Sequence, residues 1–229
     1  MRKVLFLALL LAEGGGMIAA RHQIAAQGRL YDSKVEYLQS DGTQWIDTGI
    51  NQTEDLSISL AFMPISLNGQ HWGCYFGCGE SDDPKSNILG RCYDTDLGSW
   101  NPWFAQDSYD ATRFSGVSTT SMNVATLRFG YTSINGAEYS ISSKSGRLRS
   151  GLSIYLFDWH STTHAPRRMS CRIASFQIRR NGELILDYIP VRVGSGGYMY
   201  DSVTKSLVGS NGTSAFAVGP DTREEFDWI

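Results

Sequence analysis

The stretch VEYLQSDGTQWIDTGI, from Val35 to Ile50, carries the clearest strand-and-turn pattern in the chain. Apolar and polar residues alternate on both sides of Asp41-Gly42, which is typical of strands with one buried face. Asp-Gly is a favoured turn pair, so we predict a hairpin here with Asp41 in its turn. Beyond the turn, Trp45 and Asp47 share one face of the second strand. The stretch therefore predicts a β fold rather than an acidic active site.

Similar strand signals continue along the chain. In DLSISLAF the residues Leu56, Ile58, Leu60 and Phe62 fall on one face. GLSIYLFDW, residues 151–159, is almost continuously apolar, so we expect a strand that is covered on both faces. No segment after residue 30 has an apolar stripe with the 3.6-residue period of a helix. Many short strands predict an all-β fold, a two-sheet antiparallel β-sandwich or jelly roll.

Two Asn-Gly pairs and one proline locate turns and strand ends. Asn181-Gly182 predicts a tight hairpin because both positions tolerate a positive φ, and Asn135-Gly136 is a weaker second case. Pro190 follows the first hairpin. We expect it to end its strand or to lie at a sheet edge, because proline has no N–H to donate.

Composition limits the classes of function. The 229 residues have a formal net charge of −3, with 24 glycines and 12% aromatic residues, a mixture that suits short strands and turns. No basic run is longer than the two residues of Arg179-Arg180, so we do not expect a nucleic-acid partner. Four cysteines are present, and we expect buried free thiols, with a disulfide or a zinc site as alternatives. They are Cys74, Cys78, Cys92 and Cys171.

The first thirty residues have two interpretations. Arg2 and Lys3 precede an apolar run from Val4 to Ala12, which is shorter than the about 20 residues needed to span a bilayer. This start resembles a secretory signal peptide, but Glu13 and the glycines after it interrupt the pattern. The alternative, which we favour, is a short apolar or helical arm that docks into a protein partner. No transmembrane span is expected.

Three segments carry a resemblance to a known family: VEYLQSDGTQWIDTGI, LSIYLFDW followed by CRIASFQIRRNGELILDYIPVRV, and GGYMYDSVTKSLVGSNGTSAF. Together they resemble the concanavalin A-like, laminin-G-like jelly-roll domains of gut-bacterial surface proteins and of phage or prophage structural proteins. The resemblance spans about residues 31–219 and implies a two-sheet sandwich whose first and last strands are adjacent. We therefore divide the chain into an arm (1–30), a jelly-roll domain (31–219) and a C-terminal tail (220–229).

We find no pattern typical of an enzyme. A glycosidase on this fold needs two carboxylates about 5 to 9 Å apart. Two carboxylates with strand spacing occur at Asp94 and Asp96, in a segment that reads as a solvated turn. The nucleophile elbow, the zinc-protease motif and a phosphate-binding glycine loop are missing. The sequence therefore predicts that the chain is not an enzyme.

The segment GSWNPWFAQDSYD is the best ligand candidate. We expect a loop whose aromatic rings stack on sugar rings while its amide and carboxylate groups bind hydroxyls. Capping of the sandwich core and a protein interface are the alternatives. The residues of this predicted glycan site are Trp100, Asn101, Trp103, Phe104, Gln106, Asp107 and Tyr109.

Two weaker patterns point to metals. Asp158, His160 and His164 stand close enough for a transition-metal site. Glu80, Asp82 and Asp83 form an acidic loop with the oxygen ligands that calcium prefers. Solvated polar loops are the favoured alternative at both places, so no cofactor is expected.

These observations favour a non-enzymatic structural or adhesion module of a phage or prophage virion. Such a module displays a jelly roll for glycan or surface binding and is attached to a protein partner through the arm. The sequence leaves open whether the chain also forms homo-oligomers. The alternative is a secreted bacterial carbohydrate-binding protein with a cleaved signal peptide, extracellular or at the cell surface. A jelly-roll glycosidase is the least favoured hypothesis.

Overall fold

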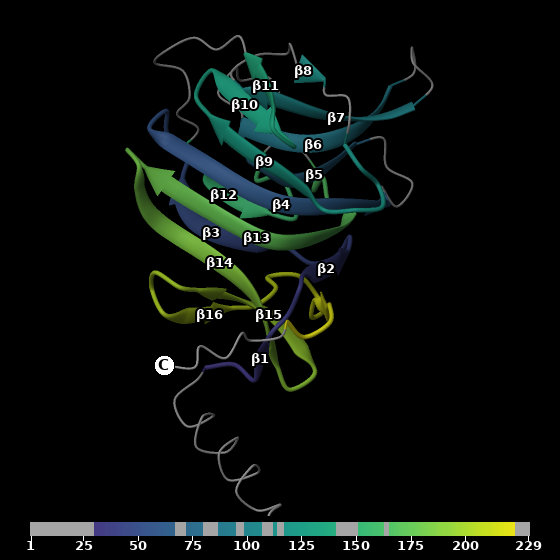
Figure 1. Cartoon of the computed structure of the whole chain (residues 1–229), viewed down its shortest axis with the longest axis vertical. Coiled ribbons are helices and arrows are strands. Elements are labelled where there is room, and N and C mark those ends of the chain that lie inside the picture. The colour runs from purple at the N-terminus through teal and green to yellow at the C-terminus, as the bar shows by residue number, and fades with distance from the viewer. Residues whose placement is uncertain are drawn as a thin grey trace, which may run out of the picture.

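The structure is a computed structural model, and it describes residues 30–66, 72–79, 87–94, 99–106, 112–113, 117–140, 151–162 and 165–222 (Figure 1). For residue 72 and for residues 87–94, 99–106 and 112–113 only the backbone pairing is described. The described residues form strands, turns and bends but no helix, and hence no helix there could cross a membrane. The predicted arm, residues 1–30, lies outside the described residues except for its last position.

The chain forms strands of two to eleven residues. Their bounds are β1 Ser33–Lys34, β2 Leu38–Asp41, β3 Ile46–Asn51, β4 Leu56–Ser66, β5 Trp72–Cys78, β6 Asn87–Asp94, β7 Ser99–Gln106, β8 Thr112–Arg113, β9 Asn123–Arg128, β10 Tyr131–Ile134, β11 Ala137–Ser140, β12 Ser153–Leu156, β13 Ser170–Arg180, β14 Glu183–Val193, β15 Gly196–Asp201, β16 Ser206–Val208 and β17 Ala217–Val218.

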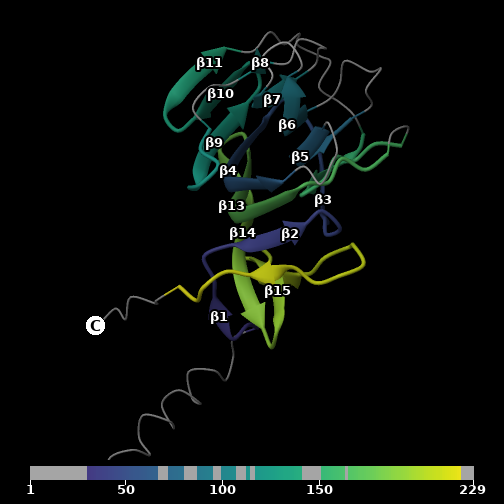
Figure 2. The same cartoon turned by 90° about the vertical axis from the view of Figure 1, so that its right-hand side faces the viewer.

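Two antiparallel sheets form a β-sandwich, which confirms the predicted fold class. The larger sheet has the order β11-β10-β9-β4-β13-β14-β15-β16, with β1, β2 and β17 added at β14 and β13. The smaller sheet has the order β3-β12-β5-β6-β7-β8, so β3 is one of its edge strands. Figure 2 shows the layers from the side, with β9, β4 and β13 in one layer and β5 and β3 in the other.

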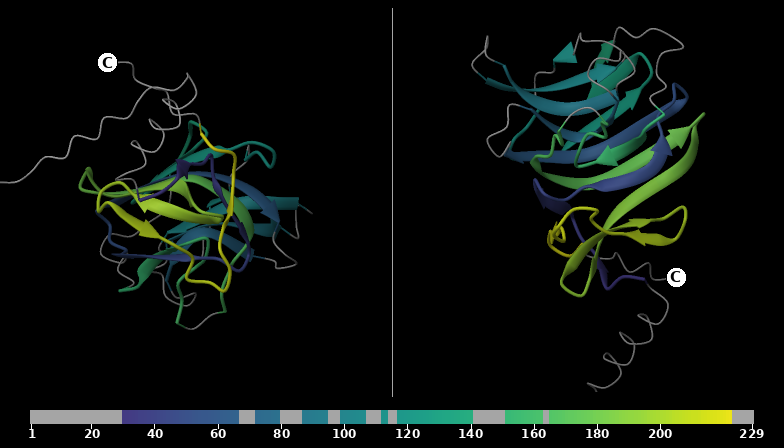
Figure 3. Two further views of the ribbon diagram at one scale, coloured as in Figure 1. Left: turned by 90° about the horizontal axis from the view of Figure 1, so that it is seen from below. Right: turned by 180° about the vertical axis from the view of Figure 1, so that it is seen from behind.

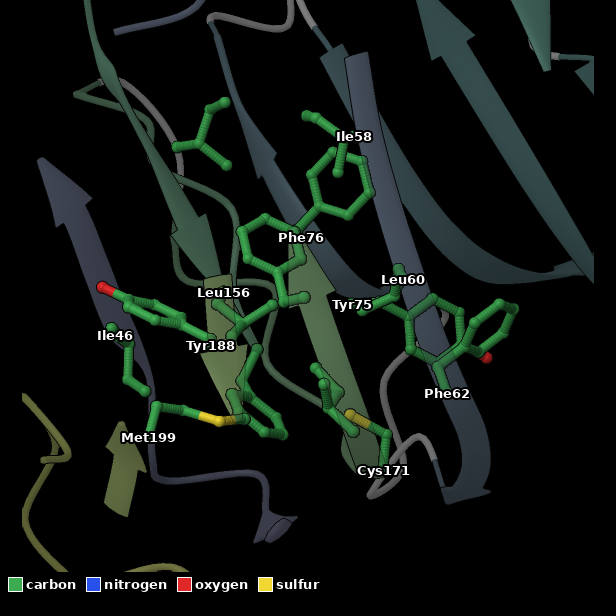
Figure 4. Packing of buried hydrophobic residues seen from close by; sticks show 14 of the residues in the cluster. Ile46, Ile58, Leu60, Phe62, Tyr75, Phe76, Leu156, Cys171, Tyr188 and Met199 are labelled. Atoms are coloured by element: carbon green, nitrogen blue, oxygen red, sulfur yellow. The ribbon is translucent and has the colours of Figure 1, made fainter. Parts of the chain in front are cut away.

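Alternating side chains build the core between the sheets. Along β4 every second residue is buried, as predicted for Leu56 to Phe62. Rings from the two sheets meet directly: the centroids of Phe62 and Tyr75 are 4.3 Å apart, and those of Phe76 and Phe176 are 5.7 Å apart (Figure 4). Each fully buried aromatic or aliphatic side chain contributes about 1.5–3 kcal/mol to stability.

Both Asn-Gly hairpins are confirmed. Asn181 and Gly182 have φ values of 50° and 86° and join β13 to β14, with Arg180 opposite Glu183. Asn135 and Gly136 have φ values of 51° and 83° and join β10 to β11. These pairs adopt the positive φ values that a two-residue hairpin turn requires.

The hairpin predicted at Asp41-Gly42 is wrong, although the turn exists. β2 pairs with β13 and β17 in the larger sheet, whereas β3 pairs with β12 in the smaller sheet. The turn therefore carries the chain from one sheet to the other. The N–H and hydroxyl groups of Thr43 donate to Asp41 Oδ1 at 2.9 and 2.7 Å, so Asp41 holds the turn as expected. The hydroxyl bond also lowers the pKa of Asp41.

The two ends of the described chain pair with each other, as the resemblance implied: β17 pairs with β2, and residues 221–222 lie beside residues 34–35. Leu38 pairs with Val218, Val35 with Asp221, and the N–H of Thr222 donates to the carbonyl of Lys34 at 2.9 Å. Residues 220–222 of the predicted tail thus continue the strand pairing of the domain. Figure 3 shows this end from below, in its left view.

Two strand predictions need correction. Pro190 lies inside β14, opposite Met199 of β15, rather than at a strand end or a sheet edge. It is tolerated there because β14 pairs with β13 only as far as Tyr188, and the carbonyl of Pro190 accepts from the N–H of Val35. The predicted long strand GLSIYLFDW is only four residues in the structure, β12, with alternating rather than two-sided burial.

Three of the cysteines are free and buried: Cys74, Cys78 and Cys171. The expectation of buried free thiols is confirmed for them. Burial raises the pKa of the Cys74 and Cys171 thiols far above the ordinary range. These thiols are therefore neutral packing groups at neutral pH.

Candidate functional site on the outer face of β3 and β12

β3 and β12 present one face to the core and one face to the outside. Ile46 and Leu156 are opposite each other and fully buried, whereas Asp47 and Tyr155, the next pair in register, are half-buried and face outwards. Trp45 lies just before β3, on the same side as Asp47, as the alternation predicted. The right view of Figure 3 looks at the molecule from the side of this sheet.

Three rings stack on this outer face, and we call Trp45, Tyr155 and His160 the aromatic row. The centroid of Tyr155 lies 4.3 Å from that of Trp45 and 3.9 Å from that of His160, which is within 9° of parallel to it. Two rings at such separations cannot share one face, so Trp45 and His160 cover opposite faces of Tyr155. Both faces of the Tyr155 ring are therefore covered by its neighbours in the row. Trp45, Tyr155 and His160 are each half-buried.

A break in β12 brings His160 into the row. Phe157 has a φ of 66°, which is unusual for a bulky residue and ends the strand. The chain then returns to β5, where the N–H of His160 donates to Gly77 at 3.1 Å and its carbonyl accepts from Gly79 at 2.9 Å. Gly77 is opposite Tyr155, and because glycine has no side chain, it leaves room for the His160 ring beside Tyr155.

Asp158 holds the segment that follows the break. Its side chain is 2% exposed and pairs with Arg168, whose Nε lies 2.7 Å from Oδ2. The backbone N–H groups of Trp159 and Arg167 both donate to Oδ1 at 2.8 Å. Asp158 thereby ties residues 158–159 to residues 167–168, and the Arg168 guanidinium lies 5.6 Å from the centroid of Trp45.

The free edge of β3 is protected by side chains. The N–H of Asp47 donates to Asn211 Oδ1 at 3.1 Å, and the N–H of Gly49 donates to Asp47 Oδ1 at 2.8 Å. An unpaired strand edge invites pairing with another chain, and capped N–H groups discourage it. The edge of β3 is therefore better suited to side-chain contacts with a ligand than to addition of a strand.

Electrostatics at the row are set by two carboxylates and one guanidinium. Burial raises the pKa of the Tyr155 phenol; the charges of Asp47 and Asp158 raise it further, and Arg168 opposes them. The phenol therefore stays protonated at neutral pH, where its hydroxyl donates or accepts a hydrogen bond. Aromatic surface next to hydroxyl, carboxylate and imidazole groups is the chemistry of a binding site for polar ligands with apolar faces.

The predicted glycan site has a different local structure from the one expected. Trp100, Asn101, Trp103, Phe104 and Gln106 lie in β7, a strand paired with β6, and not in a loop. The loop prediction is wrong: the segment is rich in aromatic residues, which favour strands, and it pairs along its length with β6. Asp107 and Tyr109 lie outside the described residues, as do the side-chain positions of the others. Their role in glycan binding stays a prediction.

The metal predictions divide in the same way. Asp158 and His160 are near each other, but both Asp158 oxygens accept hydrogen bonds from the protein, one of them in the pair with Arg168. His164, Glu80, Asp82 and Asp83 lie outside the described residues. Within the described part of the chain, no group of three His, Cys, Asp or Glu side chains has the arrangement of a metal site.

Comparison with known proteins identifies no family for this chain. No family model matches the sequence, and no curated protein does. Among solved structures, the heptameric SAP-like pentraxin from Limulus polyphemus is similar at 10% identity and a TM-score of 0.45, over 83% of this chain and 92% of that chain. Domains LG4-5 of the mouse laminin alpha1 chain are similar at 10% identity and a TM-score of 0.43, over 66% of this chain and 43% of that chain.

The fold of the chain is the two-sheet antiparallel β-sandwich that its own strand pairing shows. The prediction that it is not an enzyme is contradicted. A third similar structure is scytalido-glutamic peptidase, at 13% identity and a TM-score of 0.37, over 80% of this chain and 100% of that chain. Because an enzyme is among the similar structures, the fold is no ground for excluding catalysis, and the exclusion is withdrawn. The likeness itself concerns the fold alone.

Proposed function

We propose that this chain is a surface-displayed recognition module that binds glycans through the aromatic row. The observation that carries the proposal is the stack of Trp45, Tyr155 and His160 on the outer face of β3 and β12. Sugars have apolar C–H faces and hydroxyl edges, and an outward-facing set of rings with polar atoms complements both. Asp47 supplies a carboxylate directly beside Tyr155.

We further propose that the module belongs to a phage or prophage particle, where the arm of residues 1–30 attaches it to a protein partner. The position of the chain ends supports this arrangement. β1 pairs with the end of β14 and lies beside residues 221–222, at the lower end of the described domain in Figure 1, away from β3 and β12. Attachment at the β1 end leaves the outer face of β3 and β12 open to a ligand.

A glycan array tests the binding proposal. Wild-type protein should retain at least one glycan, and Trp45→Ala should weaken that binding about tenfold or more, because it removes a ring contact and the support of Tyr155. Tyr131→Ala removes a half-buried ring from β10 of the other sheet and serves as the matched control, with unchanged binding. Binding that survives Trp45→Ala but disappears in the Trp100→Ala, Trp103→Ala double variant would move the site to β7. Retention of no glycan by the wild-type chain would refute glycan binding.

The attachment proposal has its own test. Mass spectrometry of purified particles should find this chain with the residues before Arg21 intact. A mature chain that starts near Arg21 and is recovered only from the medium would contradict particle attachment and favour the secreted alternative.

A further inference from the structure

Contacts with Ser153 favour one tautomer of the His160 ring. Nδ1 lies 2.9 Å from the Ser153 carbonyl oxygen, which only accepts, and 3.2 Å from the Ser153 hydroxyl, which accepts as well as donates. With Nδ1 as the donor of the neutral ring, Nε2 is an acceptor. The near-parallel contact with Tyr155 holds the ring plane in place. His160 thus offers an acceptor that is oriented before any ligand binds.

Asp47 offers a second acceptor beside the first ring. Its Oδ1 accepts from the N–H of Gly49 at 2.8 Å, and no residue that the structure describes donates to Oδ2. Cross-strand neighbours in direct register have Cβ atoms about 4.5–5.5 Å apart, so this carboxylate lies next to the Tyr155 ring. Oδ2 is therefore available to a hydroxyl or amine donor on a ligand.

The charge around the row is negative. Asp47 and Asp158 carry two negative charges and Arg168 one positive charge. Arg168 is already paired with Asp158, so the charge of Asp47 has no cation paired with it among the described residues. Burial is the main cause of the raised pKa of the Tyr155 phenol, and both carboxylates raise it further. An acidic group placed at the row meets like charge, and like-charge contacts oppose binding.

We propose that the aromatic row selects neutral, hydroxyl-rich saccharides and discriminates against acidic ones, with Asp47 Oδ2 and His160 Nε2 accepting from ligand hydroxyls. This inference rests on the proposed glycan-binding function and names the class of glycan. Hydroxyls donate to both acceptors, whereas a ligand carboxylate has no proton to donate and is repelled by Asp47.

The test uses pairs of oligosaccharides that differ at one position, a neutral hexose in one member and the corresponding uronic acid in the other. Wild-type protein should bind the neutral member at least about tenfold more tightly at low salt, since an unscreened like-charge contact costs about 1.4 kcal/mol or more. Asp47→Asn keeps an oxygen for the Gly49 N–H and removes the charge, so the fold is retained. We expect this variant to reduce the neutral-to-acidic preference at least about threefold.

Glu36→Gln is the matched control, because Glu36 is an exposed carboxylate on the β1–β2 segment. It should leave the preference unchanged. Equal or tighter binding of the acidic member by the wild type, or an unchanged preference in Asp47→Asn, would overturn the proposed selectivity while glycan binding stands. Failure of both members of every pair to bind would instead refute the proposed function itself.

Discussion

The segments around β12 and β13 are both apolar in sequence, but β13 extends over 11 residues whereas β12 ends after four. β13 pairs with β4 on one side and β14 on the other, and the local Asn181-Gly182 turn sets one of these pairings. β12 pairs with β3 and β5 over a few residues each, with an irregularity against β3. A local turn sets the pairing of β13 with β14, whereas both pairings of β12 join segments that are distant in sequence.

Of these two segments, the one around β12 is the more informative, because its strand ends abruptly before Phe157. A positive φ at a non-glycine residue costs about 1–2 kcal/mol. At Phe157 the surroundings compensate: the ring is buried 4.7 Å from that of Phe216, and its N–H donates to Tyr75 at 2.6 Å. Strained backbone concentrates near functional sites, and this residue directly precedes the segment that carries Asp158 and His160. The comparison predicts that the β13–β14 hairpin tolerates changes that the β3–β12 region does not.

Two glycines give the largest expected contrast. A Cβ atom at Gly212 would lie 2.1 Å from the carbonyl oxygen of Thr43, in the turn that leads to Trp45. Gly182 in the β13–β14 hairpin has open space around it and a φ of 86°. Gly212→Ala should therefore lower the free energy of unfolding by more than about 3 kcal/mol, and Gly182→Ala by only about 1 kcal/mol. Urea unfolding of both variants measures the difference. Equal losses in the free energy of unfolding would contradict the expectation that the β3–β12 region tolerates less change than the β13–β14 hairpin.

The loss of stability at alkaline pH tests whether the buried thiols of both sheets are equally protected from solvent. The pKa values of Cys74, on β5, and Cys171, on β13, are raised by burial, so the folded state holds these protons more tightly than the unfolded state. Stability is then complete below the unfolded thiol pKa of about 8.5 and falls above it by about 1.4 kcal/mol per pH unit for each thiol, or about 3 kcal/mol for both by pH 9.5.

Cys74→Ala and Cys171→Ala should each remove about half of this alkaline loss in urea unfolding measured from pH 7 to 9.5. A variant that leaves the loss unchanged would identify a thiol that already titrates normally in the folded state. The sheet that carries that thiol would then be open to solvent.

The ion pairs Asp158–Arg168 and Asp221–Arg192 compare the region after β12 with the end of β14. Asp158→Asn leaves the Arg168 guanidinium without its buried partner, and we expect a loss of about 2 kcal/mol, since Arg168 is itself 26% exposed. Asp221→Asn breaks the pair with Arg192 on β14, where the acid is 56% exposed, and should cost less than about 1 kcal/mol. Thermal unfolding of both variants provides the measurement. A larger effect at Asp221 would contradict the view that the buried Asp158 side chain holds the region after β12.

The smallest effect concerns local opening. Cys74 and Cys78 lie on β5 beside the short β12, and Cys171 lies in the long β13. Under native conditions a thiol reagent should label the two β5 thiols several-fold faster than Cys171, because regions with fewer paired residues open at lower free energy. Mass-spectrometric mapping of the labelled peptides gives the order. Simultaneous labelling would indicate that the sandwich opens as one unit.

The sequence predicts the elements that depend on neighbouring residues. Asn-Gly pairs require positive φ values and produce hairpins wherever they join two strands, and alternation along β4 assigns its buried face. Asp41-Gly42 shows the limit of such signals. The pair specifies a turn, but which sheet receives β3 depends on β12, which lies about a hundred residues further along the chain.

The candidate site was only partly predictable for the same reason. Alternation places Trp45 and Asp47 on one face, and the sequence places Asp158 near His160. Tyr155 was assigned to a strand covered on both faces, because an apolar run does not reveal where its pairing stops. Only the structure shows that β12 ends at Leu156, that the Asp158 carboxylate forms an ion pair with Arg168, and that the His160 ring stacks on the Tyr155 ring. These contacts join residues whose proximity depends on the loop after the break.

NMR titration tests most directly whether a saccharide binds to the aromatic row. The chain has six tryptophans, whose indole N–H signals are assigned by single Trp→Phe variants. On addition of a neutral saccharide retained on the array, the Trp45 indole and the His160 imidazole signals should shift together and saturate, while those of Trp100 and Trp103 stay in place. Shifts at Trp100 and Trp103 with Trp45 and His160 unchanged would contradict the assignment of the site.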